Sequence, residues 1–357
     1  MAKPRKLMIP VAQLSVGKVR AAVILISLLL IVCARAAHTR NVALRPGDII
    51  VADRSASDGV GAVIRIDPKS GAQSSISSGG LLSQVDRITS DGKGRILVTL
   101  RVSESTHRLA GIARINPATG AQKLLSSGGR LLCPSGIATE ADGKIVVVDP
   151  CAVLVIRVDS QTGRQTVISS GKNLIFPEGI AIAADQSIIV AASKSFGGTG
   201  AILSIDPATG VEKVISARGN FSSPTDVAVD RRGRILVADF NSFACGPGGY
   251  TGRGAGAIFG LARSSDVQTL ISCDHLFQGG GPHGIAVEAD DQIVVTSYSD
   301  YAKSVGKVIR IDPVTGAQTR VSSAGMLVAP TGIAVVVANG AGGPTSRVVG
   351  SRGAPVN

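Results

Sequence analysis

The chain has 357 residues, a formal net charge of +12 and 44% hydrophobic residues, so it can bury a large core. It contains no Trp and only 3% aromatic residues, which argues against a site that stacks sugars or bases. Basic residues beyond the first 36 positions are scattered singly, and this spacing argues against a nucleic-acid partner.

The first 36 residues have the layout of a targeting segment. Several basic residues up to Arg20 precede an apolar run from Ala21 to Ala34, and Ala34-Arg35-Ala36 offers a small-x-small cleavage site. We therefore expect a secretory signal peptide over 1–36, a linker over 37–45 and an extracytoplasmic location, either secreted or periplasmic. The alternative is an uncleaved signal anchor that holds the protein at a membrane, although the run is shorter than the ~20 residues of a comfortable span.

Three short apolar runs follow the linker, and we expect each to be a β-strand. They are Asp48–Ala52, Ala62–Ile66 and Ala72–Ile76. Such runs are rich in Ile and Val and too short for helices, and turn residues bound them. The phrase Asp67-Pro68-x-x-Gly71 separates the second run from the third. Pro presets the turn and Gly supplies a positive φ, so the phrase predicts a tight turn wherever it recurs. It returns in close variants at Asn116, Asp206 and Asp312.

A second phrase, close to Pro-x-Gly-Ile-Ala, marks the start of each later unit. It occurs at Pro134–Ala138, Pro177–Ala181, Pro224–Ala228, Pro282–Ala286 and Pro330–Ala334. A repeat of this length is typical of propellers and solenoids. Each unit carries four apolar runs, which in the third unit are Gly179–Ala183, Ser187–Ala191, Ala201–Ile205 and Glu212–Ile215.

These repeats predict an all-β fold, a six-bladed β-propeller of four-stranded antiparallel blades over residues 46–340. Five blades begin near Val85, Pro134, Pro177, Pro224 and Pro282. The sixth is split, because Pro330–Val337 has no strands after it and the first three runs have no innermost strand before them. Pairing the N- and C-terminal segments would close the ring and remove free sheet edges. Residues 341–357, rich in Gly, Ser and Arg, are predicted to be a disordered tail.

The pattern resembles the NHL-repeat propellers and the related group of gluconolactonase-type and streptogramin-lyase-type enzymes. The Gly-Ile-Ala strand starts carry the resemblance, together with the Asp residues that end second strands, namely Asp53, Asp149 and Asp239. It covers roughly residues 46–340 and implies the fold, while fold alone does not assign a function. We interpret the three Asp residues as structural caps, with a ligand role as the alternative.

Four cysteines lie beyond the leader, and their even number in an exported chain favours disulfides. Starts of innermost strands and connections from second to third strands lie on the same face of a propeller. Cys133 and Cys151 occupy these two positions in one blade. Cys245 lies in a second-to-third connection and Cys273 just after the fourth strand of the same blade. We therefore predict Cys133–Cys151 and Cys245–Cys273, with four small buried apolar residues as the alternative.

The same topology predicts one loop-bearing face, because the long inserts all join a second strand to a third. They are Asp53–Gly61, Leu100–Ala110, Ser193–Gly200, Asp239–Gly256 and Ser297–Gly306. Variable loops on a rigid scaffold are where binding residues concentrate. The insert at 240–256 is the longest, and it is either a lid or binding loop or a solvated decoration.

The central funnel is the candidate site for chemistry. Read in parallel, the starts of the innermost strands are Val85-Asp86, Ser135-Gly136, Glu178-Gly179, Thr225-Asp226, His283-Gly284 and Thr331-Gly332. Asp86, Glu178 and Asp226 are candidate ligands for a single divalent cation, Ca²⁺, Mg²⁺, Mn²⁺ or Zn²⁺. His283 is a candidate catalytic acid or base, or a further ligand. The alternative is that polar residues simply line a wet axis.

The resemblance implies related roles for these residues. Gluconolactonase-type enzymes hold their metal partly with acidic side chains at the channel, a role that Asp86, Glu178 and Asp226 could match. Streptogramin-lyase-type enzymes use His and Glu near the channel, and here His283 and Glu178 are the candidates. The chain has no Gly-x-Ser-x-Gly nucleophile elbow and no phosphate-binding loop.

Three hypotheses for function follow. The first is an exported NHL-like propeller, monomeric, that acts as a binding scaffold for a protein, peptide or small molecule on its loop-bearing face. The second is a metal-dependent hydrolase or lyase, lactonase-like, with its site at the channel mouth. The third is a structural protein of the cell envelope.

Overall fold

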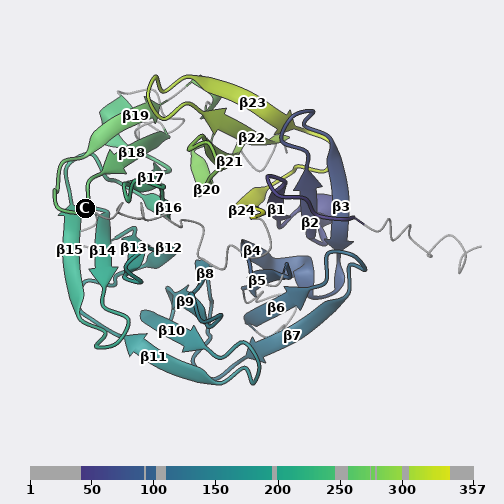
Figure 1. The fold of residues 1–357 in the computed structure, drawn as a ribbon, viewed down its shortest axis with the longest axis horizontal. Helices are drawn as coiled ribbons and strands as arrows, with labels where there is room; N and C mark the ends of the chain where they lie inside the picture. The colour runs from purple at the N-terminus through teal and green to yellow at the C-terminus, as the bar shows by residue number, and fades with distance from the viewer. Residues whose placement is uncertain are drawn as a thin grey trace, which may run out of the picture. The chain divides into compact units, whose positions relative to one another are not determined.

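Six four-stranded antiparallel sheets surround a central axis in the part of the chain that the structure describes (Figure 1). The structure is a computed structural model that describes residues 42–91, 94–101, 110–194, 199–245, 256–273, 275–277, 280–299 and 305–337. Each sheet is one blade, so the predicted six-bladed β-propeller is confirmed. The predicted leader and tail lie outside the described residues.

The blades follow one another in chain order, and each runs outward from an innermost strand. Blade 1 contains β4 (Val85–Ser90), β5 (Ile96–Leu100), β6 (Gly111–Ile115) and β7 (Gln122–Ser127). Blade 2 contains β8 (Ile137–Thr139), β9 (Ile145–Asp149), β10 (Leu154–Val158) and β11 (Gln165–Ser169). Blade 3 contains β12 (Pro177–Ile182), β13 (Ile188–Ala192), β14 (Ala201–Ile205) and β15 (Glu212–Ala217).

The remaining blades repeat the arrangement. Blade 4 contains β16 (Pro224–Val229), β17 (Ile235–Asp239), β18 (Ala257–Leu261) and β19 (Thr269–Cys273). Blade 5 contains β20 (Pro282–Val287), β21 (Ile293–Ser299), β22 (Val305–Ile311) and β23 (Gln318–Ser323). Blade 6 contains β24 (Pro330–Val335), β1 (Ile49–Asp53), β2 (Ala62–Ile66) and β3 (Gln73–Ser78).

The two ends of the described chain meet in blade 6. Strand β24 pairs antiparallel with β1, with Ile50 opposite Ala334 and Val51 opposite Ile333. This pairing supplies the innermost strand that the first three strands lack. The predicted closure of the ring is therefore confirmed.

Short helical turns occupy connections between strands. They are α2 (Ala56–Gly59), η1 (Gly80–Gln84), η2 (Phe243–Cys245) and η3 (His275–Phe277). Within the described ranges, no helix combines the length and apolar character needed to cross a membrane.

Burial explains why the inner strands are apolar on both faces. Every residue of β5, β9, β13 and β17 is buried, because neighbouring blades cover both sides of each sheet. The outermost strands, such as β7, instead combine exposed, half-buried and buried residues. A strand covered on both faces therefore reads as a continuous apolar run, which is how the sequence predicted it.

Adjacent blades are also joined by a repeated polar contact. In blade 1 the Gln122 side chain donates hydrogen bonds to the Ser77 hydroxyl and the Gly79 carbonyl of blade 6. The contact that closes the ring is of the same kind, because Gln73 donates to the Ser322 hydroxyl. The other blades use Gln165 with Ser126, Glu212 with Ser169, Gln268 with Ser216 and Gln318 with Ser272.

The Gly of the Pro-x-Gly-Ile-Ala phrase is required by close approach of the innermost strands. A Cβ atom on Gly179 would lie 2.4 Å from Cα of Asp226, and one on Gly332 would lie 2.8 Å from Cα of Arg87. Neither glycine has a positive φ, so packing alone selects Gly here. At these glycines the backbones of adjacent innermost strands therefore approach each other closely.

Candidate functional site

The structure corrects the alignment of the first innermost strand by one residue. In blade 1 Ile88 pairs with Val98, as Ile180 pairs with Val190 in blade 3. Asp86 therefore corresponds to Ser135 and Glu178, and Arg87 takes the place of the phrase glycine. Two rings result. The mouth ring, nearest the loop-bearing face, is Asp86, Ser135, Glu178, Thr225, His283 and Thr331; the glycine ring below it is Arg87, Gly136, Gly179, Asp226, Gly284 and Gly332.

This register separates the predicted ligands. Asp86, Glu178 and His283 lie in the mouth ring, whereas Asp226 lies one layer lower in the glycine ring. Among the described residues, these four side chains do not bring three ligand atoms within 4.8 Å of one another. The arrangement therefore does not favour the metal site, whose ligand set stays a prediction from sequence.

Arg87 occupies the axis that the prediction left open. Its side chain is 6% exposed, and its Nη2 donates a hydrogen bond of 2.9 Å to the Thr225 carbonyl. Its Nη1 donates to the carbonyls of His283, at 2.8 Å, and Thr331. One guanidinium from blade 1 therefore binds the innermost strands of blades 4, 5 and 6. It places a fixed positive charge where the prediction placed a cation.

Asp86 is neutralised by a second set of arginines. Arg54 approaches one carboxylate oxygen to 2.7 Å and Arg101 approaches the other to 3.4 Å, while the Ser135 hydroxyl donates at 3.1 Å. Burial, the largest influence, raises the pKa of Asp86, but the neighbouring arginines and the hydroxyl lower it to about 2. Asp86 is thus ionised and enclosed, with its side chain 3% exposed.

The other two acidic candidates have the opposite tendency. Burial raises the pKa of Asp226 to about 6, although Arg87 and the backbone N–H groups of Ile285 and Val227 oppose it. Burial also raises the pKa of Glu178, opposed chiefly by Arg87. The Ser193 hydroxyl lies 3.4 Å from a Glu178 carboxylate oxygen. These two carboxyls therefore take up protons more readily than ordinary ones.

His283 is held by aromatic contacts. Its ring stacks on Tyr298 with centroids 4.1 Å apart and lies 4.9 Å from the Phe240 ring. Burial, assisted by the charges of Arg87 and Arg54, lowers its pKa well below the usual value, so the imidazole is neutral. Its Nε2 is buried and makes no hydrogen bond within the described chain. A catalytic role for His283 stays a prediction.

Below the glycine ring the channel is lined by apolar and polar residues, the latter including Thr89, Ser90 and Thr139. A cavity of about 50 Å³ is bordered by Arg87 and Asp226 at one end and by the residue that follows the phrase glycine in each blade. These residues are Ile88, Ile137, Ile180, Val227, Ile285 and Ile333. The space is large enough for a few water molecules and too small for an organic substrate.

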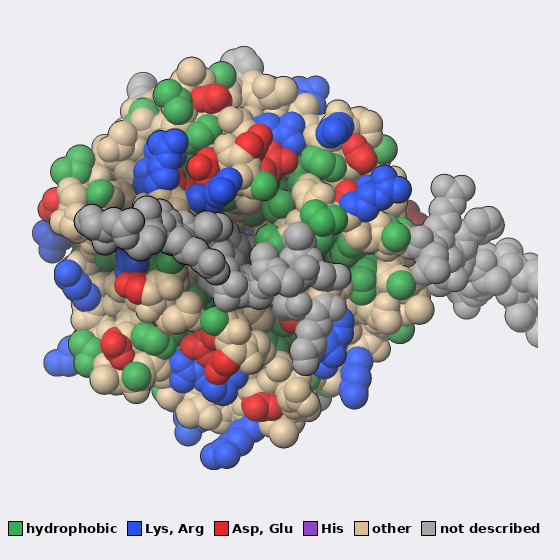
Figure 2. All heavy atoms as spheres, viewed as in Figure 1, with side chains coloured by type: hydrophobic (Ala, Val, Ile, Leu, Met, Phe, Trp, Pro, Cys, Tyr) green, Lys and Arg blue, Asp and Glu red, His purple; other side chains and the backbone are tan. Residues whose placement is uncertain are grey.

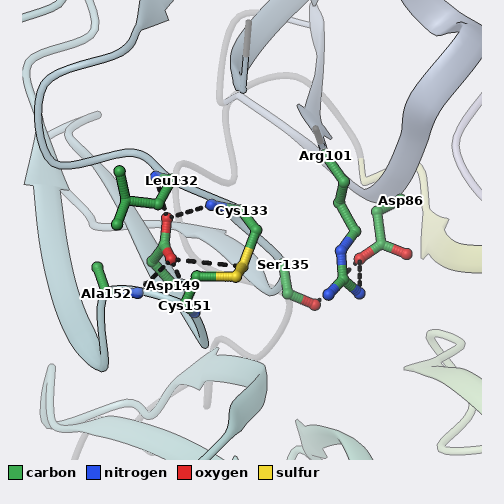
Figure 3. The surroundings of a disulfide bond; sticks show 8 residues. All are labelled: Asp86, Arg101, Leu132, Cys133, Ser135, Asp149, Cys151 and Ala152. Carbon is green, nitrogen blue, oxygen red and sulfur yellow. Dashed lines mark hydrogen bonds and ion pairs between the residues drawn. A yellow bond between two sulfur atoms is a disulfide. The ribbon is translucent and has the colours of Figure 1, made fainter. Parts of the chain in front are cut away.

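The second-strand Asp residues act as caps, as the sequence indicated. Asp149 accepts hydrogen bonds from the N–H groups of Leu132 and Cys133 on one side and of Cys151 and Ala152 on the other (Figure 3). Asp53 and Asp239 bind backbone N–H groups at the equivalent places in blades 6 and 4. Each Asp therefore ties the loop after its strand to the connection that enters the blade.

The predicted Cys133–Cys151 disulfide joins the same two segments (Figure 3). Cys133 is buried and Cys151 is exposed. The disulfide links the same two segments that Asp149 joins by hydrogen bonds. Both a covalent bond and hydrogen bonds therefore hold these segments together on the loop-bearing face. The same three residues also place their ligand atoms within 4.8 Å, but the sulfurs are bonded to each other and the carboxylate to the backbone.

The predicted Cys245–Cys273 disulfide is wrong in this structure, where both residues are thiols. Both side chains pack at the edge of the apolar cluster between blades 3 and 4. The Cys245 sulfur lies 3.9 Å from the Gly256 carbonyl. Shared location on one face places these residues at the same cluster, but location alone does not meet the specific geometry that a disulfide requires.

The loop-bearing face exposes four apolar residues in connections of blades 2 and 3, which we call the apolar group. Its members are between 38% and 50% exposed, and they are Leu132, Val153, Ile175 and Phe176. Leu132 and Val153 flank the disulfide, while Ile175 and Phe176 directly precede β12. Val153 and Phe176 adopt φ angles of 57° and 53°, which side chains rarely tolerate, least of all a β-branched one.

Exposed charge on the same face is mainly basic. The buried carboxylates of Asp53, Asp149 and Asp239 accept hydrogen bonds from backbone N–H groups. In the described loops of this face, the exposed acidic residue is Asp58. The arginine pair, Arg54 and Arg101, keeps side chains 32% and 35% exposed beside the enclosed Asp86. Further basic surface residues on its connections are Arg130, Lys172, Lys194 and Arg218.

Long stretches of the predicted inserts lie outside the described residues, including 102–109, 195–198, 246–255 and 300–304. The ends that are described confirm that each insert joins a second strand to a third. On the face drawn in Figure 2, acidic and basic side chains are interspersed around the ring and form no single basic patch.

The fold and these features define a six-bladed propeller with a plugged axis and an elaborated loop face. Residues 221–244, which enter blade 4 and form its first two strands, match the NHL repeat family. This match and the fold confirm the resemblance to NHL-repeat propellers. No curated protein sequence matches the chain.

Two solved structures are similar to this chain in fold. The chain is similar to a chain of the nidogen/laminin complex, with a TM-score of 0.62 and 11% identity over 82% of this chain and 98% of that one. It is also similar to TolB from Acinetobacter baumannii, with a TM-score of 0.60 and 12% identity over 84% of this chain and 67% of that one. At these identities the likeness concerns the fold alone.

Proposed function

We propose that the protein is an exported binding scaffold whose loop-bearing face engages a protein or peptide. The observation that carries this proposal is the exposed apolar group beside the Cys133–Cys151 disulfide. Exposed apolar groups of this kind mark interaction sites on soluble proteins. Backbone strain at Val153 and Phe176 adds support, because strained residues persist where the surrounding structure holds them and they concentrate at functional positions.

The mouth of the channel supports binding better than the hydrolase or lyase alternative. Asp86 is paired with Arg54 and Arg101, and Arg87 spans the axis to carbonyls of other blades. The disulfide is in keeping with an oxidising compartment and hence with export. In a binding role, the NHL-type fold would be a rigid support that presents its loops to the partner.

Photo-crosslinking tests the proposal. A photoreactive residue is placed at Phe176, on the loop-bearing face, or at Val314, which is 87% exposed in the β22–β23 turn on the opposite face. In the cells that make the protein, we expect a discrete crosslinked product from position 176 and none from position 314. Equal crosslinking from both positions, or none from either, would contradict the proposal. Fractionation of the same cells shows whether the product is extracytoplasmic.

A further inference from the structure

We propose that the partner is an acidic peptide segment with apolar side chains, bound on the loop-bearing face from the channel mouth between blades 6 and 1 across blades 2 and 3. This inference rests on the proposed function and specifies the chemistry of the ligand. Carboxylates of the segment would meet the arginine pair at the channel mouth, and its apolar side chains would cover the apolar group.

The accessible charged groups beside Asp86 are arginines. Asp86 neutralises charge at the mouth but is buried, whereas Arg54 and Arg101 each keep about a third of the side chain exposed. An approaching ligand therefore meets guanidinium groups first. Guanidinium binds carboxylate in a planar, charge-assisted geometry, and this geometry favours a carboxylate ligand over a neutral one.

Short stretches of chain link the channel mouth to the apolar group. The Ser135 hydroxyl donates to the Asp86 oxygen that Arg101 also approaches (Figure 3), and Leu132 is three residues before Ser135 in the same connection. Glu178 in the mouth ring is two residues after Phe176. One extended segment leaving the mouth over blades 2 and 3 would therefore pass directly from the arginine pair to the apolar group.

The ammonium group of Lys194 lies over the Phe176 ring, 4.5 Å from the ring centroid. A cation held over an exposed aromatic ring offers apolar surface and positive charge at a single point. A segment that carries both acidic and apolar side chains complements this combination, while a purely apolar partner would leave the ammonium without water or a counter-ion.

The effect of substituting Glu178 separates specific binding of an acidic segment from non-specific binding to this face. Unlike Asp86, Glu178 forms no ion pair with an arginine among the residues that the structure describes, and its ionised form repels an incoming carboxylate. Its neutral form would bind the segment better. Binding should therefore strengthen, not weaken, in Glu178→Gln, opposite to the effect of removing a guanidinium.

The test measures fluorescence anisotropy of the full chain with a labelled peptide in which Glu alternates with Leu. Two counterpart peptides replace every Glu with Gln or every Leu with Ser. We expect each counterpart to bind at least about fivefold more weakly, since loss of a rim charge or an apolar anchor is worth about 1 kcal/mol. Affinity for the Glu–Leu peptide should also fall with added NaCl.

Variants locate the site. Arg101→Gln and Phe176→Ser should each weaken binding about fivefold, whereas Arg232→Gln and Val314→Ser, on the opposite face, should not change it. Glu178→Gln should tighten binding about twofold to fivefold. Equal effects of Arg101→Gln and Arg232→Gln, or weaker binding in Glu178→Gln, would overturn the proposal.

Two further outcomes separate the alternatives. Binding to vesicles of phosphatidylcholine and phosphatidylserine in equal parts, without binding to the Glu–Leu peptide, would overturn the proposal in favour of an anionic membrane surface. A crosslink from position 176 that persists in Arg101→Gln, with no peptide binding, would leave the scaffold function standing and refute the acidic partner.

Discussion

The guanidinium of Arg87 in blade 1 donates a 2.9 Å hydrogen bond to the Thr225 carbonyl in blade 4, on the opposite side of the ring. The same side chain reaches the carbonyls of His283 and Thr331. Most contacts in a propeller join neighbouring blades, so a side chain that crosses the axis couples blades that otherwise do not touch. Arg87 is therefore expected to act on the stability of the whole ring.

Replacing Arg87 with Met should destabilise the protein by about 2–4 kcal/mol, because buried carbonyls of three blades lose their charged donor. Chemical unfolding of the wild type and the variant measures this difference. The matched control is Arg95→Gln, which breaks a pair with Asp91 whose arginine is 38% exposed and should cost less than about 1 kcal/mol. If both variants lost a similar amount of unfolding free energy, the Arg87 contacts would contribute no more to stability than a half-exposed ion pair.

The raised pKa of Asp226, about 6, predicts that it makes the folded protein less stable at neutral pH than at acidic pH. Between about pH 4 and 6 the unfolded chain has released this proton while the folded chain retains it. The free energy of unfolding therefore falls as pH rises through that window, by up to about 3 kcal/mol, and is flat above it. Asp239, with a pKa also raised to about 6 by burial, contributes in the same window.

Asp226→Asn removes one of these contributions. The variant should gain stability over the wild type as pH rises from about 4 to about 7, measured by chemical unfolding at several pH values. Asp185→Asn is a control of opposite sign. Although burial raises the pKa of Asp185, hydrogen bonds from Arg263 and Ser187 lower it to about 2. This carboxylate stabilises the fold above about pH 4, and its removal should cost stability there. An Asp226→Asn curve parallel to the wild type would refute the assignment.

Thiol counting distinguishes the two cysteine pairs. In protein that lacks residues 1–36, unfolding without reductant should expose the thiols of Cys245 and Cys273 and leave Cys133–Cys151 intact. Reduction should then destabilise the fold by about 3 kcal/mol, because the disulfide closes a loop with a sequence separation of 18. The absence of any reactive thiol before reduction would instead restore the second predicted bridge.

Chelation tests the metal hypothesis. Since Asp86 is enclosed by arginines and Asp226 lies in another layer, we expect EDTA to leave the melting temperature unchanged. A cation bound only by the native state would stabilise it, so chelation of a resident metal would lower the melting temperature. Such a decrease, absent in Glu178→Ala, would revive the hydrolase or lyase alternative. Elemental analysis of the untreated protein provides the independent check.

The fold was predictable because its evidence repeats along the chain. The Asp-Pro-x-x-Gly turns and the Pro-x-Gly-Ile-Ala starts recur in phase, and strand edges such as Ala62–Ile66 and Ala201–Ile205 agree with the structure residue for residue. Strand β24 could be placed in blade 6 because an innermost strand was missing there.

The site was less predictable because it depends on departures from the repeat. Blade 1 lacks the proline, and aligning Val85-Asp86 with Ser135-Gly136 hid Arg87 at a glycine position. Aligning on Ile88 instead would have revealed it. Arg54 and Arg101 come from loops, and no periodicity indicates that they converge on Asp86. The orientation of the Cys245 and Cys273 sulfurs depends on local rotamers, which strand order does not determine.

Placing the innermost strand of blade 6 at the far end of the polypeptide also affects the timing of folding. A ribosome makes β1 early, but β1 keeps an open edge until residue 335 has emerged. The hydrogen bonds of Arg87 also form late, because their acceptor carbonyls belong to strands that are synthesised after Arg87. The ring of a nascent chain therefore stays open through nearly all of translation and closes only after the last innermost strand has been synthesised.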